Sequence, residues 1–131
     1  MANTSLITFA LNPGINYGGD PADSGNYGSV WTDFDGDNDL DLFVAHCRQS
    51  TSSVTDLRRK DRLFVNNGNN VYTEQSTAYG IELAGAYNQT WTAMFGDINN
   101  DGDFDLGLVN HDVASQILEN DGTGDYSDIT S

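Results

Sequence analysis

Basic residues are scarce in this chain of 131 residues, which carries five lysines and arginines against 20 aspartates and glutamates. The formal net charge is −15, and no basic stripe is present that could meet the phosphates of a nucleic acid or an anionic membrane surface. The one basic cluster, Arg58-Arg59-Lys60 with Arg62, is short and typical of a solvated loop. We therefore expect no nucleic-acid partner and no membrane insertion.

Cysteine is nearly absent as well. Cys47 is the only one, so the chain cannot form an internal disulfide, and the sequence assembles no base around it that would activate a catalytic thiol. No apolar run approaches the length of a membrane span, and the first residues lack the basic stretch and apolar core of a signal peptide. Because no nucleophile, base and oxyanion hole can be recognised together, we do not expect an enzyme.

Acidic residues, by contrast, are concentrated in two nine-residue stretches, DFDGDNDLD at 33–41 and DINNDGDFD at 97–105. Both place side-chain oxygens at positions 1, 3, 5 and 9 of the stretch. Calcium prefers six to eight oxygen ligands at about 2.3–2.6 Å, and alternate residues of a tight loop can direct oxygens at one centre. Neighbouring carboxylates repel one another unless a cation neutralises them, so the repeated pattern predicts two calcium ions per chain. The candidate ligands are Asp33, Asp35, Asp37, Asp39 and Asp41 in the first loop and Asp97, Asn99, Asp101, Asp103 and Asp105 in the second.

The remaining sequence predicts an all-β fold. Apolar residues alternate after the first acidic loop, and Asn67-Gly68 and Asp121-Gly122 each lie between short β-prone runs, as in hairpins. No segment shows a sustained helical period. The predicted strands are Tyr27–Thr32, Asp41–His46, Arg62–Asn66 and Val71–Ser76, followed by Thr90–Gly96, Asp105–Asn110, Gln116–Glu119 and Gly124–Thr130.

The two halves of the chain are copies of each other. Asp33 aligns with Asp97 at an offset of 64 residues (97 − 33), whereas Tyr72 aligns with Tyr126 at an offset of 54 (126 − 72). The first copy therefore holds about ten additional residues, which we place in the polar stretch Cys47–Lys60. Each copy has four predicted strands, and four-stranded units repeated in sequence are typical of β-propeller blades.

Helical calcium-binding motifs do not fit the two loops. An EF-hand requires a bidentate glutamate at loop position 12, which is Val44 in the first copy and Leu108 in the second. A dockerin-like loop should run into an amphipathic helix, but the first loop continues into an alternating, strand-like run.

Both loops resemble the calcium loops of FG-GAP repeats, also called VCBS-type repeats, which occur in integrin-like β-propellers. The run RLFVNNG at 62–68, followed by Tyr72-Thr73 and by Tyr79-Gly80-Ile81, resembles the second half of such a blade. The resemblance implies calcium between the first two strands of each blade, bound by side chains from positions 1, 3, 5 and 9 and by the backbone carbonyl of position 7. Asn38 stands where the second copy has Gly102, and asparagine tolerates the left-handed backbone, so we expect this departure to weaken the first site little.

We interpret residues 1–15 as a strand resembling the outer strand of a preceding blade, 16–81 as the first blade and 82–131 as the second. Two blades cannot close a ring, so either the chain is a fragment of a longer propeller or identical chains complete the ring. Three chains would give six blades and four would give eight (3 × 2 and 4 × 2). We expect a homo-oligomer, with the trimer favoured, if the chain is not a fragment.

Three functions remain open at this point. The first is a calcium-stabilised module for recognition or adhesion, with a protein or carbohydrate ligand and with calcium serving the structure. The second is an oligomeric lectin with sugar sites between blades, and the third is a non-catalytic part of a larger secreted enzyme. His46 and His111 follow the second strands of their blades and could line a ligand site, although polar residues at a strand end are the simpler interpretation. The resemblance implies an extracellular or cell-surface location.

Overall fold

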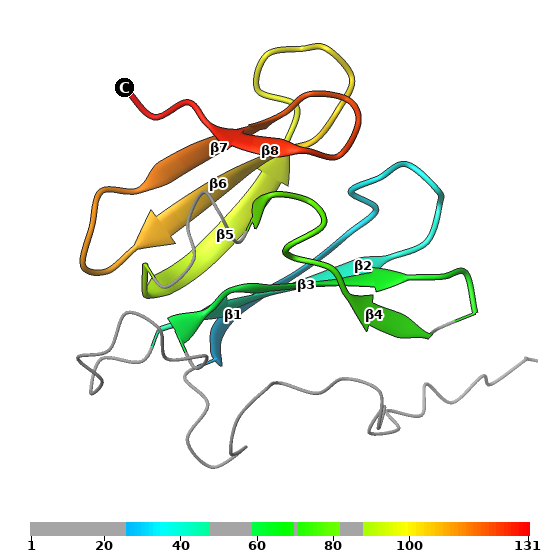
Figure 1. The fold of residues 1–131 in the computed structure, drawn as a ribbon, viewed down its shortest axis with the longest axis horizontal. Helices are drawn as coiled ribbons and strands as arrows, with labels where there is room; N and C mark the ends of the chain where they lie inside the picture. The colour runs from blue at the N-terminus through cyan, green and yellow to red at the C-terminus, as the bar shows by residue number, and fades with distance from the viewer. Residues whose placement is uncertain (1–25, 48–58, 70, 82–87) are drawn as a thin grey trace, which may run out of the picture.

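The structure is a computed structural model that describes residues 26–47, 59–69, 71–81 and 88–131. Within these ranges, eight strands form two four-stranded antiparallel sheets, in the orders β1-β2-β3-β4 and β5-β6-β7-β8 (Figure 1). The all-β prediction with two four-stranded units is confirmed, and the two sheets do not form a closed ring. The strands are β1 (Asn26–Thr32), β2 (Asp41–His46), β3 (Arg62–Asn66), β4 (Tyr72–Glu74), β5 (Thr90–Gly96), β6 (Asp105–Asn110), β7 (Gln116–Asn120) and β8 (Tyr126–Asp128).

Each sheet is a meander in which consecutive strands pair as neighbours. The first and second strands pair in the same register in both sheets, since Trp31 lies opposite Leu42 in the first sheet and Phe95 lies opposite Leu106 in the second. Both first strands also shift register near their start, as a β-bulge does. The internal repeat inferred from the sequence is thus a repeat of structure down to the pairing of individual residues.

The outer strands β4 and β8 are each three residues long, shorter than the sequence predicts, whereas the other six strands fall within one residue of their predicted bounds. These strands end early because a backbone N–H of the neighbouring strand bonds to a side-chain hydroxyl and not to a strand carbonyl. The hydroxyl of Ser76 accepts the N–H of Leu63 at 2.7 Å, and the hydroxyl of Thr130 accepts the N–H of Ile117 at 2.9 Å. A side-chain oxygen therefore replaces the strand carbonyl at the same place in both sheets and ends the regular pairing.

The main hydrophobic core lies between the two sheets, which pack face to face (Figure 1). Strand β2 is buried along its whole length, because it is a central strand with apolar side chains on both of its faces. Burying these side chains removes apolar surface from water, which is the dominant favourable contribution to folding. The core residues are Phe34, Phe43, Ala45, Leu63, Val65, Ile81, Ala93, Leu106, Leu108, Leu118 and Tyr126.

The sheets stack in the same orientation, as successive blades of a propeller do. Val30 and Leu63 of the first sheet face the second sheet and pack in the shared core. Their repeat equivalents, Met94 and Ile117, alternate with core residues and therefore lie on the outer face of the second sheet. Met94 is 61% exposed and Ile117 is 39% exposed. We call Met94, Val109 and Ile117 the open face of the second blade.

The second position of each acidic loop shows the same asymmetry. Phe34 is buried between the sheets, where its ring lies edge-on to Tyr79 at 4.9 Å and 6.4 Å from the ring of Phe95. Ile98, the equivalent residue of the second loop, is exposed. The same loop position is therefore buried where a blade follows and exposed where the described residues provide none.

Leu42, Val44 and Phe64 form a smaller buried cluster on the outer face of the first sheet, with Tyr72 packed against it. The predicted strand within 1–15 and residues 48–58 of the predicted polar stretch lie outside the described residues, so these expectations stay predictions. No helix within the described ranges is long and apolar enough to cross a membrane.

Candidate metal centre

The two acidic loops connect β1 to β2 and β5 to β6, and both lie at the same edge of the stacked sheets. The β3–β4 and β7–β8 hairpin turns lie at this edge too (Figure 1). A four-stranded meander brings them together because the start of β2 and the end of β3 are at the same end of the sheet. The loop ligands and the hairpin turns are therefore neighbours in each blade.

Three carboxylates converge in the first loop. Asp33, Asp35 and Asp37 each offer one oxygen, and these oxygens lie within 4.8 Å of one another. Backbone amides hold the side chains in place, since the N–H of Asn38 donates to Asp33 Oδ2 at 3.1 Å and that of Asp39 donates to Asp37 Oδ1 at 2.9 Å. Burial raises the pKa of Asp35, and the charges of its two acidic neighbours raise it further. The loop thus brings together negative charges that repel one another without a cation.

The surroundings of the Asp33 carboxylate show whether the first loop fits a cation. Its Oδ1 atom is buried and has no hydrogen-bond partner among the described residues. A buried carboxylate oxygen without a partner is costly, and a hard cation such as calcium prefers oxygen ligands of this kind. The donor set of the first loop therefore fits calcium.

The second loop has the same kind of backbone-to-side-chain hydrogen bonds as the first, but an asparagine replaces the aspartate at position 3. Asp97 accepts the N–H of Asp101 at 3.0 Å, which fixes the turn. Asn99 stands at position 3, where the first loop has Asp35, and its amide donates to Asp101 at 2.7 Å and to Glu119 at 3.0 Å. Within the described ranges, three converging acidic side chains are found only in the first loop. The amide supplies one neutral oxygen in place of a carboxylate.

The side chain at position 7 turns toward the hairpin in both loops. The carboxylate of Asp39 lies over the β3–β4 turn, where a Cβ atom on Gly68 would stand 3.0 Å from its Oδ2. Asp103 lies in the same way over Gly122, where the distance would be 2.9 Å. Both glycines also have positive φ angles, which a side chain would strain. A ligand from position 7 would accordingly come from the backbone carbonyl.

The side chain at position 9 is fully buried in both loops. Asp41 accepts the N–H of Asn66 at 2.8 Å with Oδ1 and the N–H of Phe34 at 3.4 Å with Oδ2. Asp105 makes the equivalent two bonds in the second blade, at 3.0 and 2.8 Å. Burial raises the pKa of Asp41 to about 6, although both amide bonds act in the opposite direction. Position 9 therefore joins the loop to the end of the third strand.

Sequence reasoning missed two asparagines that complete this arrangement. Asn66 is buried at the end of β3, where its amide donates to the carbonyl of Leu40 at 3.2 Å and its Oδ1 accepts the N–H of Gly68 at 3.2 Å. The hydroxyl of Tyr72 donates to the same Leu40 carbonyl at 3.3 Å. Asn120 occupies the equivalent place in the second blade. The 54-residue offset aligns these two asparagines and was the signal available in the sequence.

Asn38, which stands at position 6 of the first loop in place of glycine, adopts the backbone conformation that the turn requires. Asn38 has a φ of 72° and Gly102 a φ of 101°, so both residues adopt positive φ. Asparagine is among the residues that tolerate this region, and the prediction that Asn38 preserves the turn is confirmed.

The histidines singled out in the sequence lie apart from the loops. His46 is fully buried at the end of β2, and burial lowers its pKa to about 4. His111 is exposed, and its ring lies edge-on to that of Trp91, with 5.2 Å between the ring centroids. Cys47 is buried. These residues are at the opposite end of the strands from the candidate metal ligands.

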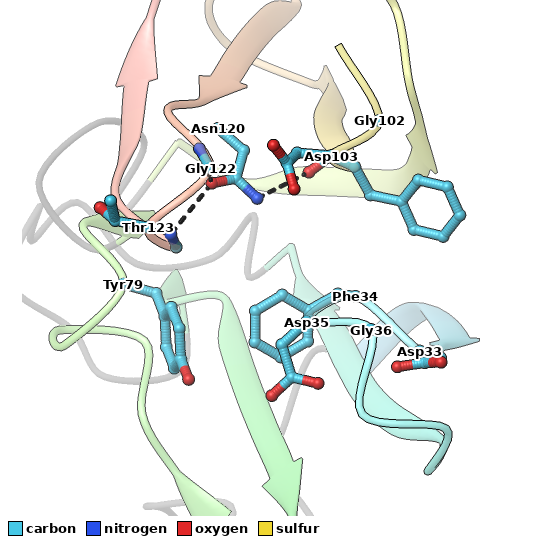
Figure 2. A pocket seen from close by; sticks show the side chains of 12 residues that line it. Asp33, Phe34, Asp35, Gly36, Tyr79, Gly102, Asp103, Asn120, Gly122 and Thr123 are labelled. Carbon is cyan, nitrogen blue, oxygen red and sulfur yellow. Dashed lines mark hydrogen bonds between the residues drawn. The ribbon is translucent and has the colours of Figure 1, made fainter. Parts of the chain in front are cut away.

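A groove of about 430 Å³ lies between the two acidic loops (Figure 2). Its walls bring together the rings of Phe34 and Tyr79, the carboxylates of Asp35 and Asp103, and Thr123 of the β7–β8 turn. Burial raises the pKa of the Tyr79 hydroxyl, and the charge of Asp35 raises it further. Aromatic, acidic and hydroxyl groups from both blades therefore meet in one open space.

The asparagine network predicts a measurable effect on stability. Asn66→Ala removes a buried side chain that accepts the N–H of Gly68 and donates to the carbonyl of Leu40, both in partly buried hydrogen bonds. We expect the free energy of unfolding to fall by about 1–3 kcal/mol in chemical denaturation. Asn67→Ala, at an exposed neighbouring position, is the control and should change it by less than about 0.5 kcal/mol. Equal losses in the two variants would contradict the assigned role.

Comparison with protein-family models matches residues 33–108 to the FG-GAP-like repeat. This range contains 76 of the 131 residues (108 − 33 + 1) and includes both acidic loops. Comparisons with curated proteins and with solved structures gave no significant match. The match covers more than half of the chain and includes the acidic loops whose geometry is described above. The chain belongs to the FG-GAP-like repeat family.

Proposed function

We propose that the chain is a calcium-stabilised repeat module in which each acidic loop binds one calcium ion. The convergence of three carboxylates within 4.8 Å in the first loop carries this proposal. The buried Oδ1 atom of Asp33, which has no hydrogen-bond partner among the described residues, supports it. Calcium would neutralise the repelling charges and join both ends of the loop, so its role is structural and no catalytic role is assigned.

The proposed ligands follow the framework common to both loops. Position 7 contributes its backbone carbonyl, because its side chain is turned to the hairpin. The second loop is included because its backbone bonds repeat those of the first, with Asn99 supplying an amide oxygen. The ligands are Asp33, Asp35, Asp37, Asp41 and the carbonyl of Asp39, and in the second loop Asp97, Asn99, Asp101, Asp105 and the carbonyl of Asp103.

The groove between the loops is the proposed recognition site of this module. Rings such as Tyr79 can stack on a sugar or an apolar side chain, and Asp35, Asp103 and Thr123 offer hydrogen-bonding groups. This composition supports recognition of a protein or a glycan, and the position between two blades favours the lectin alternative over the non-catalytic part of a secreted enzyme. A recognition or adhesion role fits an extracellular or cell-surface location, where calcium is abundant enough to fill weak sites.

The open face of the second blade is the proposed contact with a second copy of the chain. In the first blade, the equivalent positions are covered by a neighbouring sheet, whereas Met94, Val109 and Ile117 are exposed. Because the outer face of the first sheet is already buried at Leu42 and Phe64, two chains joined at their open faces form the smallest assembly. The ring of three chains is the larger one and requires that buried face to be uncovered.

Calcium titration tests the metal sites. We expect calorimetry to give two ions per wild-type chain and about one each for Asp33→Ala and Asp97→Ala, which each remove the position 1 carboxylate from one loop. Asp125→Asn changes an exposed acid outside the loops and should retain two. We expect excess chelator to lower the melting temperature by several degrees, and an unchanged melting curve would contradict the structural role.

Glycan-array binding tests the groove. Tyr79→Ala removes a ring from its wall and should reduce glycan binding by roughly twofold to tenfold, the effect of losing one aromatic contact. Tyr27→Ala is the matched control, because Tyr27 is exposed and does not line the groove. Failure of the wild-type chain to bind any glycan would reject the lectin alternative and leave a protein ligand for the module.

Sedimentation analysis tests self-association. Met94→Lys with Ile117→Lys places charges on the open face, and we expect this double variant to be monomeric where the wild-type chain is a dimer or trimer. Asn67→Lys, on the exposed β3–β4 turn, should leave the wild-type mass unchanged. A wild-type chain that sediments as a monomer at all concentrations would rule out the proposed contact.

A further inference from the structure

A buried polar contact joins the two blades at the edge opposite the acidic loops. Asp61, which immediately precedes β3, is only 4% exposed. Its Oδ2 lies 2.5 Å from the hydroxyl oxygen of Thr90, the first residue of β5, and its Oδ1 accepts the N–H of His46 at 2.8 Å. Thr90 is fully buried as well. A carboxyl group of the first blade is therefore enclosed by protein and bonded directly to the second blade.

Thr90 has one hydroxyl hydrogen but two close partners. Besides Asp61, its hydroxyl oxygen lies 3.0 Å from Oδ1 of Asn110. The hydrogen-bond network fixes the orientation of the Asn110 amide, because its Nδ2 donates to the carbonyl of Ala114 and to Oε1 of Gln116, both at 3.0 Å. Asn110 Oδ1 is then an acceptor and takes the Thr90 hydrogen. The hydrogen between Thr90 and Asp61 has to come from Asp61.

We propose that Asp61 is protonated in the folded protein and clamps the two blades together by donating its hydrogen to Thr90. The bonds then run in one direction, from Asp61 to the Thr90 hydroxyl and from that hydroxyl to Asn110. Ionisation would leave one hydroxyl hydrogen for two acceptors, so one buried oxygen would lose its partner. The clamp therefore holds while the proton is present and loosens when it leaves.

Burial supports the same protonation state. It raises the pKa of Asp61 from 3.8 to about 7, outweighing the hydrogen bonds that Thr90 and the His46 amide would donate to the ionised carboxylate. Between these two values the folded protein binds a proton that the unfolded chain has released. The stability due to this proton is therefore complete below about 3.8, declines as the pH rises to about 7, and is constant above that value.

The ionisable groups on the elements around Asp61 are Arg59, Lys60 and Arg62 on its own segment, His46 on β2, Glu74 on β4 and Asp112 after β6. Arg59 pairs with Asp112 at 2.7 Å. His46 acts in the opposite sense, because burial, with a further effect of Arg62, lowers its pKa from 6.5 to about 4. Its contribution to stability is present above about 6.5 and is lost as the pH falls toward 4. A comparison at fixed pH between two chains that share His46 isolates Asp61.

The wild-type chain is compared with Asp61→Asn, because the amide of the variant donates a hydrogen to Thr90 at every pH and still accepts the N–H of His46. Melting temperatures are compared in saturating calcium between about pH 4 and pH 8. We expect the variant and the wild-type chain to melt within a degree or so near pH 4. The variant should melt higher by roughly 5 °C or more near pH 7, with no further increase above it. Asp125→Asn removes an exposed carboxylate, and its difference from the wild-type chain should not change with pH.

A carbon-13 NMR titration of the Asp61 carboxyl in the wild-type chain measures the proton directly and requires no variant to fold. A midpoint near pH 7 supports the clamp. A midpoint below about pH 5, in the ordinary range of an aspartate, would show an ionised carboxylate at neutral pH and overturn the proposal. A melting difference for Asp61→Asn that is the same at all pH values would overturn it too.

Discussion

The buried aspartate at position 9 of each acidic loop is the interaction on which the arrangement of the blade depends. Asp41 and Asp105 are enclosed, and each accepts one amide from its own loop and one from the end of the third strand of its sheet. A buried carboxylate requires such partners, because leaving it unbonded would be costly. These bonds therefore fix the path of the loop relative to the hairpin through protein contacts alone. The loop presents its first, third and fifth side chains only because this buried residue holds it in place.

The sequence predicts the parts of the blade that depend on neighbours along the chain. Alternating apolar residues located the strands to within one residue for six of the eight, and the turn chemistry of Asn38 held. The early ends of β4 and β8 were not predicted, because they depend on Ser76 and Thr130 reaching across to a strand distant in sequence. Asn66 was missed for the same reason, since its partners lie in the loop and the turn of the folded blade. Only comparison of the two copies with each other could have exposed it.

The two copies have nearly the same internal structure but different surroundings. Phe34 fills the space between the sheets, and its equivalent Ile98 is exposed, although both follow the first aspartate of a loop. The difference does not come from the blades themselves but from their place in the stack: the first has a neighbour on this side, and the second has none among the described residues. The groove between the loops follows from the same stacking, because it exists only where one loop lies beside the next blade. The groove therefore belongs to the pair of blades and to neither blade alone.

If the loops bind calcium and Asp61 is protonated, the two edges of the blade pair respond to protons in opposite ways. Calcium ligands have to be deprotonated, so acidification opposes metal binding at the loop edge. At the other edge, the proposed clamp between Asp61 and Thr90 depends on a retained proton, so alkaline conditions oppose it. The contrast arises from the surroundings of the carboxylates: those of the first loop converge where a cation is proposed, whereas Asp61 is enclosed with a hydroxyl and a backbone amide. Under these two proposals, an aspartate in this chain stabilises the fold either as a metal ligand or as a neutral hydrogen-bond donor, and its position in the blade decides which.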